Sequence, residues 1–436
     1  MPNSREILAR LSAFRSKFEA LLASARKKAA RARVAPVGRP TRLRELTGFG
    51  ANPGKLRMFV YAPQGLPPHA PLVIALHGCT QTADEYDRGS GWSSLAERLG
   101  FAIVYPEQQP ANNPKNCFSW FLRDDTTRGS GEALSIRAMV EHAAAKLAAD
   151  PRRIFVTGLS AGGAMASAML ATYPEIFAGG AIIAGLPYGC ASNVQQAFEA
   201  MFGEQSHAAQ MLGDRVRAAS GHRGPWPKIS VWHGTSDPIV KPSNSEEIIR
   251  QWINVHGLSN APSHERLISG HRLRVWSDAD GEALVEAFSI NNMAHGVPLA
   301  TTGPQCCGSA GAFFLDAGIS STHHIARFWG LHEALGEMPR TVAPALTSLH
   351  VPTGDLAKVG AATGGLTGSA DAFFADNSGA EEEDTPYRLD PNAVIAAAFK
   401  AAGLEVPESS SSRPGIVRPV AAGPIIAAAL KRAGLR

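Results

Sequence analysis

A serine flanked by glycines follows a short apolar run in the segment Thr157-Gly158-Leu159-Ser160-Ala161-Gly162-Gly163. Residues 154–156 predict a strand and residues 164–173 predict a helix, so the serine falls on a sharp strand-to-helix turn. Only small flanking residues fit such a turn, which makes Gly158 and Gly162 steric requirements. The turn exposes the hydroxyl beside a helix N-terminus, where developing negative charge is favoured. Ser160 is therefore the candidate nucleophile; the alternative is a glycine-rich bend with a bystander serine.

A serine hydroxyl is a poor nucleophile at neutral pH, so it needs a general base, and the base needs an orienting carboxylate. In hydrolases with a nucleophile on such a turn, the acid and then the histidine follow on loops after later strands. Asp237 follows the apolar run 229–233, and His295 follows the run 284–290. The sequence therefore predicts a triad of Ser160, Asp237 and His295. The alternative for Asp237 is a turn-forming residue before proline, and the competing histidines are His233, His271, His323 and His324.

The tetrahedral intermediate of acyl transfer also needs hydrogen-bond donors for its oxyanion. One predicted donor is the backbone N–H of Ala161, directly after the nucleophile. The other is expected in the loop His77-Gly78-Cys79-Thr80 after the strand at 72–76, with the Cys79 N–H as first choice. The alternative for Cys79, a small buried residue or disulfide partner, is compatible with the donor role.

These residues must be positioned by a sheet. Most strand candidates are continuous apolar runs, which are typical of strands buried on both faces of a parallel sheet. The candidates lie at 56–62, 72–76, 102–105, 153–157, 180–184, 229–233, 273–276 and 284–290, and helical patterns alternate with them at 93–99, 132–147, 164–173 and 245–256. Ser243 or Ser245 is expected to cap the last of these helices. Alternation of this kind predicts a doubly wound, mostly parallel α/β sheet in a catalytic domain spanning residues 55–335.

Residues 1–44 contain twelve Lys and Arg residues against Glu6 and Glu19, although the whole chain is only +4. Apolar residues recur at spacings of three and four between residues 7 and 25, which predicts one amphipathic helix over residues 4–33. Such a helix can dock on the domain, pair with another copy or lie on an interface. The basic arm can meet an anionic or granule surface; the alternative is a solvated helix face. No nucleic-acid partner is expected.

Residues 336–436 are rich in Ala, Gly and Pro and predict a largely disordered linker and tail. Two similar segments, 394–404 and 425–435, predict short helical repeats ended by glycine. All seven tryptophans lie between Trp92 and Trp329. The tail therefore lacks the aromatic platform expected of a sugar-binding module.

Five cysteines are too few for a disulfide scaffold, and they follow no zinc-site spacing. A bridge between Cys79 and Cys117 is compatible with the sequence, which does not specify the pairing. No apolar stretch approaches the roughly 20 residues that span a bilayer. Arg10, Arg15 and Lys17 interrupt every short apolar run near the N-terminus, so no secretory signal is recognisable.

Four motifs in order resemble the poly(3-hydroxybutyrate) depolymerase family of esterases, which also includes feruloyl and acetylxylan-type esterases. The motifs are His77-Gly78-Cys79-Thr80-Gln81-Thr82, Tyr105-Pro106-Glu107-Gln108, Gly158-Leu159-Ser160-Ala161-Gly162-Gly163-Ala164-Met165 and Ala184-Gly185-Leu186-Pro187-Tyr188-Gly189. The resemblance covers roughly residues 55–335. It implies an α/β-hydrolase fold, a Ser160–Asp237–His295 triad, Cys79 as an oxyanion donor and an extracellular location. A cytoplasmic location is the alternative, given the missing signal.

The chain departs from the family pattern at Cys117-Phe118-Ser119-Trp120-Phe121, where a Cys-Trp-Asn-Trp-Phe run is expected. Trp120 and Phe121 are still predicted to line the substrate cleft; the alternative is that both are core aromatics. A recognisable polymer-binding module is also missing, so soluble oligomers, amorphous polymer and small esters are all candidate substrates.

The sequence thus predicts a serine esterase that hydrolyses poly- or oligo(3-hydroxybutyrate)-like esters through an acyl-enzyme and requires no metal or organic cofactor. The first alternative is a carbohydrate esterase of the feruloyl or acetylxylan type. The second, of another class, is a granule- or surface-associated binding protein in which the basic N-terminal helix acts.

Overall fold

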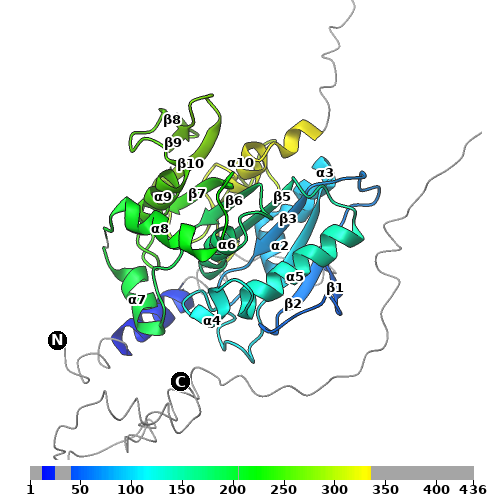
Figure 1. Ribbon diagram of the computed structural model, residues 1–436, viewed down its shortest axis with the longest axis horizontal. Helices are drawn as coiled ribbons and strands as arrows, with labels where there is room; N and C mark the ends of the chain where they lie inside the picture. Colours follow the sequence, from blue (N-terminus) through cyan, green and yellow to red (C-terminus); the bar gives the residue numbers. More distant parts are fainter. Residues whose placement is uncertain (1–11, 25–40, 205, 335–436) are drawn as a thin grey trace, which may run out of the picture. The chain divides into compact units, whose positions relative to one another are not determined.

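The computed structural model describes residues 12–24, 41–204 and 206–334, and Figure 1 shows how their elements are arranged. Contacts divide the chain into two units, and the sheet with its flanking helices belongs to the unit Phe18–Asn377. The tail and the repeats predicted for residues 336–436 lie outside the described residues.

A ten-stranded sheet with the order β1-β2-β4-β3-β5-β6-β7-β10-β9-β8 forms the centre of this unit. The interior pairings that lead from β4 through β3, β5, β6 and β7 to β10 are parallel. Antiparallel strands complete both edges. The strands are β1 (Arg44–Leu46), β2 (Arg57–Tyr61), β3 (Leu72–Leu76), β4 (Ala102–Glu107), β5 (Ile154–Leu159), β6 (Gly179–Ile183), β7 (Lys228–Gly234), β8 (His264–Ile268), β9 (His271–Ser277) and β10 (Ala283–Ile290). The predicted doubly wound, mostly parallel α/β architecture is confirmed.

Helices cover both faces of the sheet, as Figure 1 shows. The helices are α2 (Ala83–Ser90), α3 (Trp92–Leu99), α4 (Arg123–Thr126), α5 (Gly131–Lys146), α6 (Ala161–Thr172), α7 (Val194–Phe202), α8 (Ala209–Ala219), α9 (Ser243–His256) and α10 (Ser321–Phe328), with a short 3-10 turn at Leu331–Ala334. A separate pair, β11 (Val297–Leu299) and β12 (Phe314–Asp316), is parallel. Among the described residues, no helix is both long enough and apolar enough to cross a membrane.

Alternate side chains of an interior strand point to opposite faces of the sheet. Since helices cover both faces, the side chains on both sides of each interior strand are buried. In β3, Leu72, Ile74 and Leu76 pack into a core shared with α5, α6, α8 and α9. Val73 and Ala75 pack into a second core shared with α2, α3 and α10. Burial on both sides explains why these strands read as continuous apolar runs.

The ends of two helices differ from the pattern expected from sequence. Helix α9 begins at Ser243 with Pro242 in the capping position and no side-chain capping bond, so the predicted serine cap is wrong. The hydroxyl of Ser245 instead donates to the Pro242 carbonyl at 2.7 Å. Helix α6 begins at Ala161, three residues before the apolar pattern begins, because Gly162 and Gly163 are helical.

The described part of the predicted N-terminal helix is helical at residues 12–24. Leu22 is buried in the second core, and Phe18 and Leu21 pack against it half-buried. The Phe18 ring lies edge-on to Phe198 of α7, with their centroids 6.1 Å apart. For residues 18–24, the apolar stripe therefore docks on the domain, which was one of the three arrangements expected.

Candidate active site

The predicted nucleophile lies on a strained turn at the carboxyl end of a central strand. Strand β5 ends at Leu159 and helix α6 begins at Ala161, leaving Ser160 between them with φ 59° and ψ −117°. A positive φ costs a residue other than glycine on the order of 1–3 kcal/mol, so surrounding contacts must fix it. One is the bond from the Ser160 N–H to the Ile183 carbonyl, at 2.9 Å. The turn thus holds the serine at the edge where the parallel strands end.

The two glycines of the turn are sterically required, as the sequence predicts. A Cβ on Gly158 would stand 2.3 Å from the Gly162 carbonyl group. A Cβ on Gly162 would stand 2.3 Å from the Leu76 carbonyl oxygen at the end of β3. Since backbone atoms cannot rotate away as flexible side chains can, any side chain here would push the turn off the sheet.

The predicted acid and base form a buried pair. His295 Nδ1 lies 2.7 Å from Asp237 Oδ2, and the two residues are only 6% and 3% exposed. The bond fixes the proton on Nδ1 and leaves Nε2 as the basic nitrogen, as a general base for serine requires. Within the described residues, Ser160 Oγ makes no hydrogen bond to this imidazole; such bonds often tighten only in a substrate complex.

Neighbouring strands bring the acid and base loops together. Strands β7 and β10 pair in parallel up to the register pair Gly234 and Ile290, and one loop follows each strand. The Ser236 N–H donates to the Met293 carbonyl at 3.0 Å, which ties the two loops to each other. A Cβ on Gly234 would lie 2.2 Å from the Met293 carbonyl oxygen, so this approach also depends on glycine. Residues 58 positions apart in sequence thereby become hydrogen-bonded partners.

The Asp237 carboxylate is held in its charged form by its surroundings. Burial alone would raise its pKa, but the charge of His295 and hydrogen bonds from His233 and His295 outweigh burial and hold the pKa well below the usual range. The other oxygen, Oδ1, accepts from the backbone N–H groups of Ile239 and Val240 at 2.8 and 2.9 Å. These bonds also fix the orientation of the carboxylate toward the imidazole.

His233 is a neighbour of the acid that sequence reasoning ranked only as a competitor to His295. It is the penultimate residue of β7, with Nε2 at 2.9 Å from the Val240 carbonyl and 3.3 Å from Asp237 Oδ2. Nε2 must therefore carry its proton, while Nδ1 is buried without a partner among the described residues. His233 thus orients the carboxylate. Its position four residues before Asp237 was the one available signal.

The two predicted oxyanion donors lie in one small buried cluster. Cys79 forms a disulfide with Cys117, and both pack against Ala161. Within the described residues, neither the Cys79 N–H nor the Ala161 N–H donates a hydrogen bond to another group. Both are therefore available to an oxyanion. A tight turn shapes this loop, because the Gly78 N–H donates to Gln81 Oε1 at 2.8 Å.

A buried polar network beneath the disulfide was not anticipated from sequence. Glu132 Oε1 accepts from Gln108 Nε2 at 2.6 Å, and Oε2 accepts from the Ser119 N–H at 2.8 Å. The Gln108 N–H in turn donates to Nε2 of His77 at 3.0 Å, next to the oxyanion loop. Burial raises the pKa of Glu132 to about 7 and lowers that of His77 to about 4. The network joins the loops that carry Cys79 and Cys117 to the sheet and to α5.

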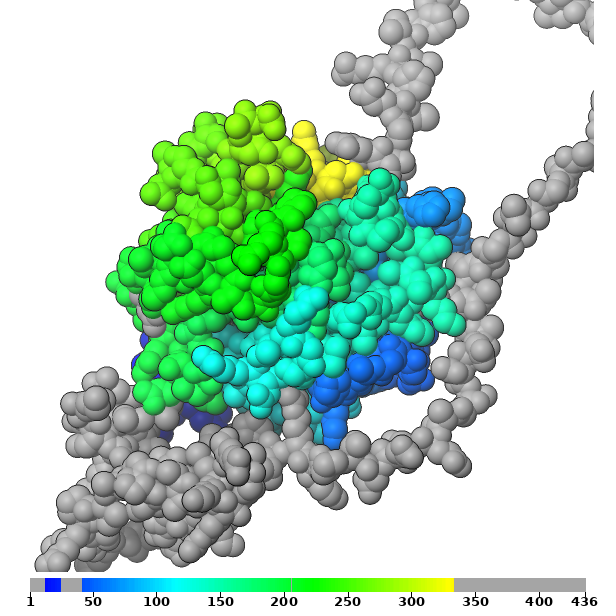
Figure 2. All heavy atoms as spheres, in the orientation of Figure 1, coloured from blue at the N-terminus to red at the C-terminus, as the bar shows by residue number. Residues whose placement is uncertain are grey.

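Of the two aromatic residues predicted to line the cleft, Trp120 lies at a groove and Phe121 packs edge-on against it, with centroids 5.5 Å apart. Trp120 also packs against the Cys79–Cys117–Ala161 cluster. The groove has a volume of about 730 Å³ and is lined by residues from α4, the loop after β6, α7 and α8. Figure 2 shows these segments on one face, the cyan of α4 next to the green of α7 and α8.

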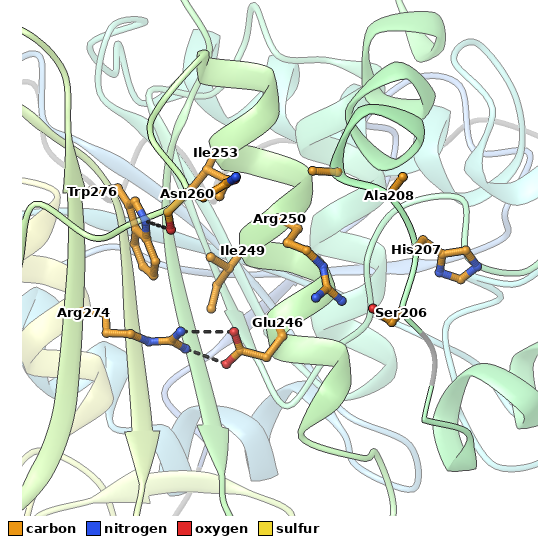
Figure 3. A pocket seen from close by; sticks show the side chains of 11 residues that line it. Ser206, His207, Ala208, Glu246, Ile249, Arg250, Ile253, Asn260, Arg274 and Trp276 are labelled. Carbon is orange, nitrogen blue, oxygen red and sulfur yellow. Dashed lines mark hydrogen bonds and ion pairs between the residues drawn. The ribbon is translucent and has the colours of Figure 1, made fainter.

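A second pocket of about 380 Å³ lies between α9 and β9 and contains none of the predicted triad (Figure 3). Its charged groups are already paired: Arg274 with Glu246 at 2.6 Å, and Arg250 with Glu247 at 2.5 Å. The Trp276 indole donates to the Asn260 carbonyl. Among the described residues, no group of three or more His, Cys, Asp or Glu side chains is placed to hold a metal ion.

Comparison with known proteins finds one family model, "Esterase PHB depolymerase", matching residues 56–274. The matched range includes Cys79, Ser160 and Asp237 and ends before His295. Poly(3-hydroxyalkanoate) depolymerase C of Paucimonas lemoignei is 47% identical over 291 residues, covering 66% of this chain and 70% of that protein. Acetylxylan esterase of Coprinopsis cinerea is 37% identical over 269 residues, covering 60% of this chain and 70% of that protein.

Among solved structures, the acetyl xylan esterase from Aspergillus awamori superposes with a TM-score of 0.57 at 25% identity. The similarity covers 66% of this chain and 99% of that enzyme.

Proposed function

The chain belongs to the esterase PHB depolymerase family and is a carboxylic ester hydrolase, and from that premise we propose that it cleaves poly- or oligo(3-hydroxyalkanoate) esters through an acyl-enzyme on Ser160. The observation that carries the proposed mechanism is the buried 2.7 Å bond between His295 and Asp237 at the strand edge that also bears Ser160.

In the first half-reaction, His295 Nε2 removes the proton of Ser160 Oγ as that oxygen attacks the ester carbonyl carbon. Asp237 keeps the imidazole in the required tautomer and stabilises the imidazolium that forms. The lowered pKa of Asp237 supports this role, because the carboxylate stays ionised through neutral and mildly acidic pH. Collapse of the tetrahedral intermediate then expels the alcohol, which takes its proton from Nε2.

The oxyanion of that intermediate is assigned to the backbone N–H groups of Cys79 and Ala161. Both belong to the cluster around the disulfide, and neither N–H is engaged with another group in the described chain. Loss of one such donor typically costs about 2.7–4 kcal/mol of transition-state stabilisation. In the second half-reaction, His295 activates a water that attacks the acyl-enzyme, and the same two donors hold the second oxyanion.

The substrate class is proposed from the relatives. The match to the Paucimonas lemoignei protein is higher in identity and longer than the match to the acetylxylan esterase, so hydroxyalkanoate esters are the first candidate. A carbohydrate esterase of the acetylxylan or feruloyl type is the second candidate, and the similarity to the Aspergillus awamori enzyme favours it. Trp120 at the groove suits an apolar acyl or alcohol chain in either case.

The test compares initial rates on 3-hydroxybutyrate oligomers, acetylated xylan oligosaccharides, methyl ferulate and p-nitrophenyl butyrate. We expect the highest kcat/KM on the hydroxybutyrate oligomers. Higher values on the acetylated sugars or on ferulate would refute the proposed substrate class and leave the mechanism standing.

The mechanism is tested with Ser160→Ala, which removes the nucleophile and should abolish turnover of every ester in this series. Ser259→Ala, a change of the same kind at an exposed position, is the matched control and should keep wild-type activity. Near-wild-type hydrolysis by a correctly folded Ser160→Ala variant would sink the nucleophile assignment.

We also propose that the basic residues of segment 1–44 contact an anionic or granule surface. The segment holds twelve Lys and Arg residues against Glu6 and Glu19, and this excess of positive charge favours an anionic partner. Replacing Lys27, Lys28, Arg31 and Arg33 by glutamine should reduce sedimentation with anionic polyhydroxybutyrate granules without changing p-nitrophenyl butyrate hydrolysis. Unchanged sedimentation would contradict this proposal.

A further inference from the structure

The groove beside Trp120 combines apolar walls with unpaired positive charge. Trp120, Ala191, Ala218 and Ala219 supply apolar surface, and the Tyr188 ring adds to it. Trp120 lines the groove and also packs against the cluster that contains Ala161, so this one side chain links the groove to the proposed oxyanion site. A substrate whose carbonyl lies at Ser160 can therefore extend into it.

Two arginines that line this groove, Arg123 and Arg215, take part in no ion pair within the described residues. Arg215 comes from α8, and its Nη1 is buried without a hydrogen-bond partner. Arg123 begins α4, is exposed, and lies close enough to Tyr188 to act on its hydroxyl electrostatically. The groove thus has two guanidinium groups with free donors and a phenol.

The other charged groups of the groove are already engaged. Arg128 donates to the Thr172 carbonyl and to Glu175 Oε1, at 2.5 and 2.6 Å. Glu199 also lines the groove, and its Oε1 accepts from Gln195 Nε2 at 2.9 Å, a bond that leaves the carboxylate charge in place. Arg128 is neutralised by Glu175, so Arg123 and Arg215 stand against the single carboxylate of Glu199, and the net charge that the groove offers a ligand is positive.

We propose that this groove binds the free carboxylate at the end of a short oligoester, with Arg215 and Arg123 as its partners. The inference rests on the proposed function, because an oligo(3-hydroxyalkanoate) ends in a carboxylate and carries small alkyl branches along its chain. The branches suit the apolar walls, and the carboxylate matches the planar fork of a guanidinium. It would also satisfy the buried Nη1 of Arg215, which otherwise lacks a partner.

The chemistry of the chain fixes which side of the scissile bond the groove holds. When the ester nearest the acid end is cleaved, the acyl part stays on Ser160 and the departing alcohol carries the terminal carboxylate. The groove therefore binds the leaving-group side. The enzyme should consequently prefer oligomers with a free acid end to the same oligomers with that end esterified.

The test compares the free-acid 3-hydroxybutyrate trimer, its methyl ester and p-nitrophenyl butyrate on the wild type and three variants. In Arg215→Gln we expect KM for the free acid to rise roughly tenfold, the effect of losing about one charge-assisted hydrogen bond, while kcat/KM for the other two substrates stays constant. Arg123→Gln should act in the same direction. Arg223→Gln is the matched control, since it removes an exposed positive charge that does not line the groove.

Arg123→Gln keeps the test valid if Arg215→Gln misfolds, because Arg123 is exposed and its replacement should leave the fold intact. The inference is overturned if both groove variants keep the wild-type preference for the free acid, or if wild type shows none. Loss of activity on all three substrates in either variant would also overturn it, because the groove would then serve the catalytic centre itself.

An acidic sugar is a second source of carboxylate, so acetylated xylan oligosaccharides with and without glucuronate form a further arm. A dependence on Arg215 confined to the glucuronate-bearing sugars would overturn the oligoester assignment. Failure of the proposed function is distinguishable from this result, because it would appear in wild type as a higher kcat/KM on neutral acetylated sugars than on any hydroxybutyrate ester.

Discussion

Replacing Asp237 by asparagine should reverse the tautomer of the catalytic imidazole without removing any side-chain volume. In the wild type, Oδ1 accepts from two backbone N–H groups and Oδ2 faces His295 Nδ1 at 2.7 Å. Backbone N–H groups cannot accept a hydrogen bond, so the new amide oxygen must take the Oδ1 position. The amide nitrogen then faces Nδ1, which must become an acceptor. The proton moves to Nε2, and the nitrogen that should activate Ser160 is blocked.

The size of the effect follows from this reversal. A serine hydrolase whose imidazole is held in the wrong tautomer loses about 10⁴ in kcat, which corresponds to roughly 5.5 kcal/mol of activation free energy. We expect Asp237→Asn to lose about 10³–10⁴ in kcat on p-nitrophenyl butyrate, with little change in KM. The residual rate should come from the oxyanion donors alone.

The substitution also carries a stability signature. The pKa of Asp237 is held below its ordinary value of 3.8, so the charged form adds stability that is full above that value and is lost as pH falls toward the lower, folded-state pKa. The wild type should therefore unfold at higher urea than Asp237→Asn at pH 7, and the gap should shrink below about pH 4.

The assay is a kcat measurement on variants shown to be folded by circular dichroism, with Asp214→Asn as the matched control. Asp214 has a side chain 57% exposed and pairs with Arg217 on the surface, so its variant should keep wild-type kcat. An Asp237→Asn enzyme within tenfold of the wild type would refute the assigned role of this carboxylate.

Two further predictions concern stability. The double variant Cys79→Ala/Cys117→Ala opens a crosslink between residues 38 apart, which should cost about 4 kcal/mol of unfolding free energy and lower kcat by loosening the oxyanion loop; identical urea curves with and without the bridge would contradict this. Burial raises the pKa of Glu286 from its ordinary value of 4.5 to about 7. The stability tied to its neutral form is therefore fully present below pH 4.5 and is lost as the pH rises through about 7. Ser230 donates to Glu286 Oε1, and a glutamine at this position keeps that bond through its amide oxygen. The free energy of unfolding of Glu286→Gln should therefore exceed that of the wild type by about 1 kcal/mol at pH 5, rising to about 3 kcal/mol at pH 8. Parallel pH dependences for the two proteins would rule the explanation out.

Features dictated by short-range sterics and by strand burial could be predicted from the sequence. The Ser160 turn was recognisable because its glycines flank the serine within five residues; Gly158 is required by the Gly162 carbonyl inside the turn, whereas Gly162 is required by the Leu76 carbonyl on β3. The interior strands were recognisable because burial on both faces demands an unbroken apolar run. Strand β8 was missed for the converse reason: four of its five residues are exposed, and it pairs only at the antiparallel edge of the sheet.

The assignment of Asp237 and His295 could be predicted only in part from the sequence, and the rest depended on the tertiary structure. Each follows a predicted strand, and the order of acid and histidine along the chain narrowed the candidates. The sequence did not reveal that β7 and β10 are neighbours, which is what lets the two loops interlock. For the contact of His233 with the same carboxylate, the sequence offered only its position four residues before Asp237.

Only the tertiary structure decided the pairing of Cys79 with Cys117, the buried carboxyl of Glu132 and the meeting of Arg123 with Arg215 at one groove. Each of these depends on residues far apart in sequence, and no local pattern marks such residues as partners. The nucleophile could therefore be identified from a few adjacent residues, because the strained turn that carries it accommodates only small residues beside the serine. The surroundings that tune that chemistry and select a substrate were determined by packing, because only the folded sheet brings their residues within contact distance.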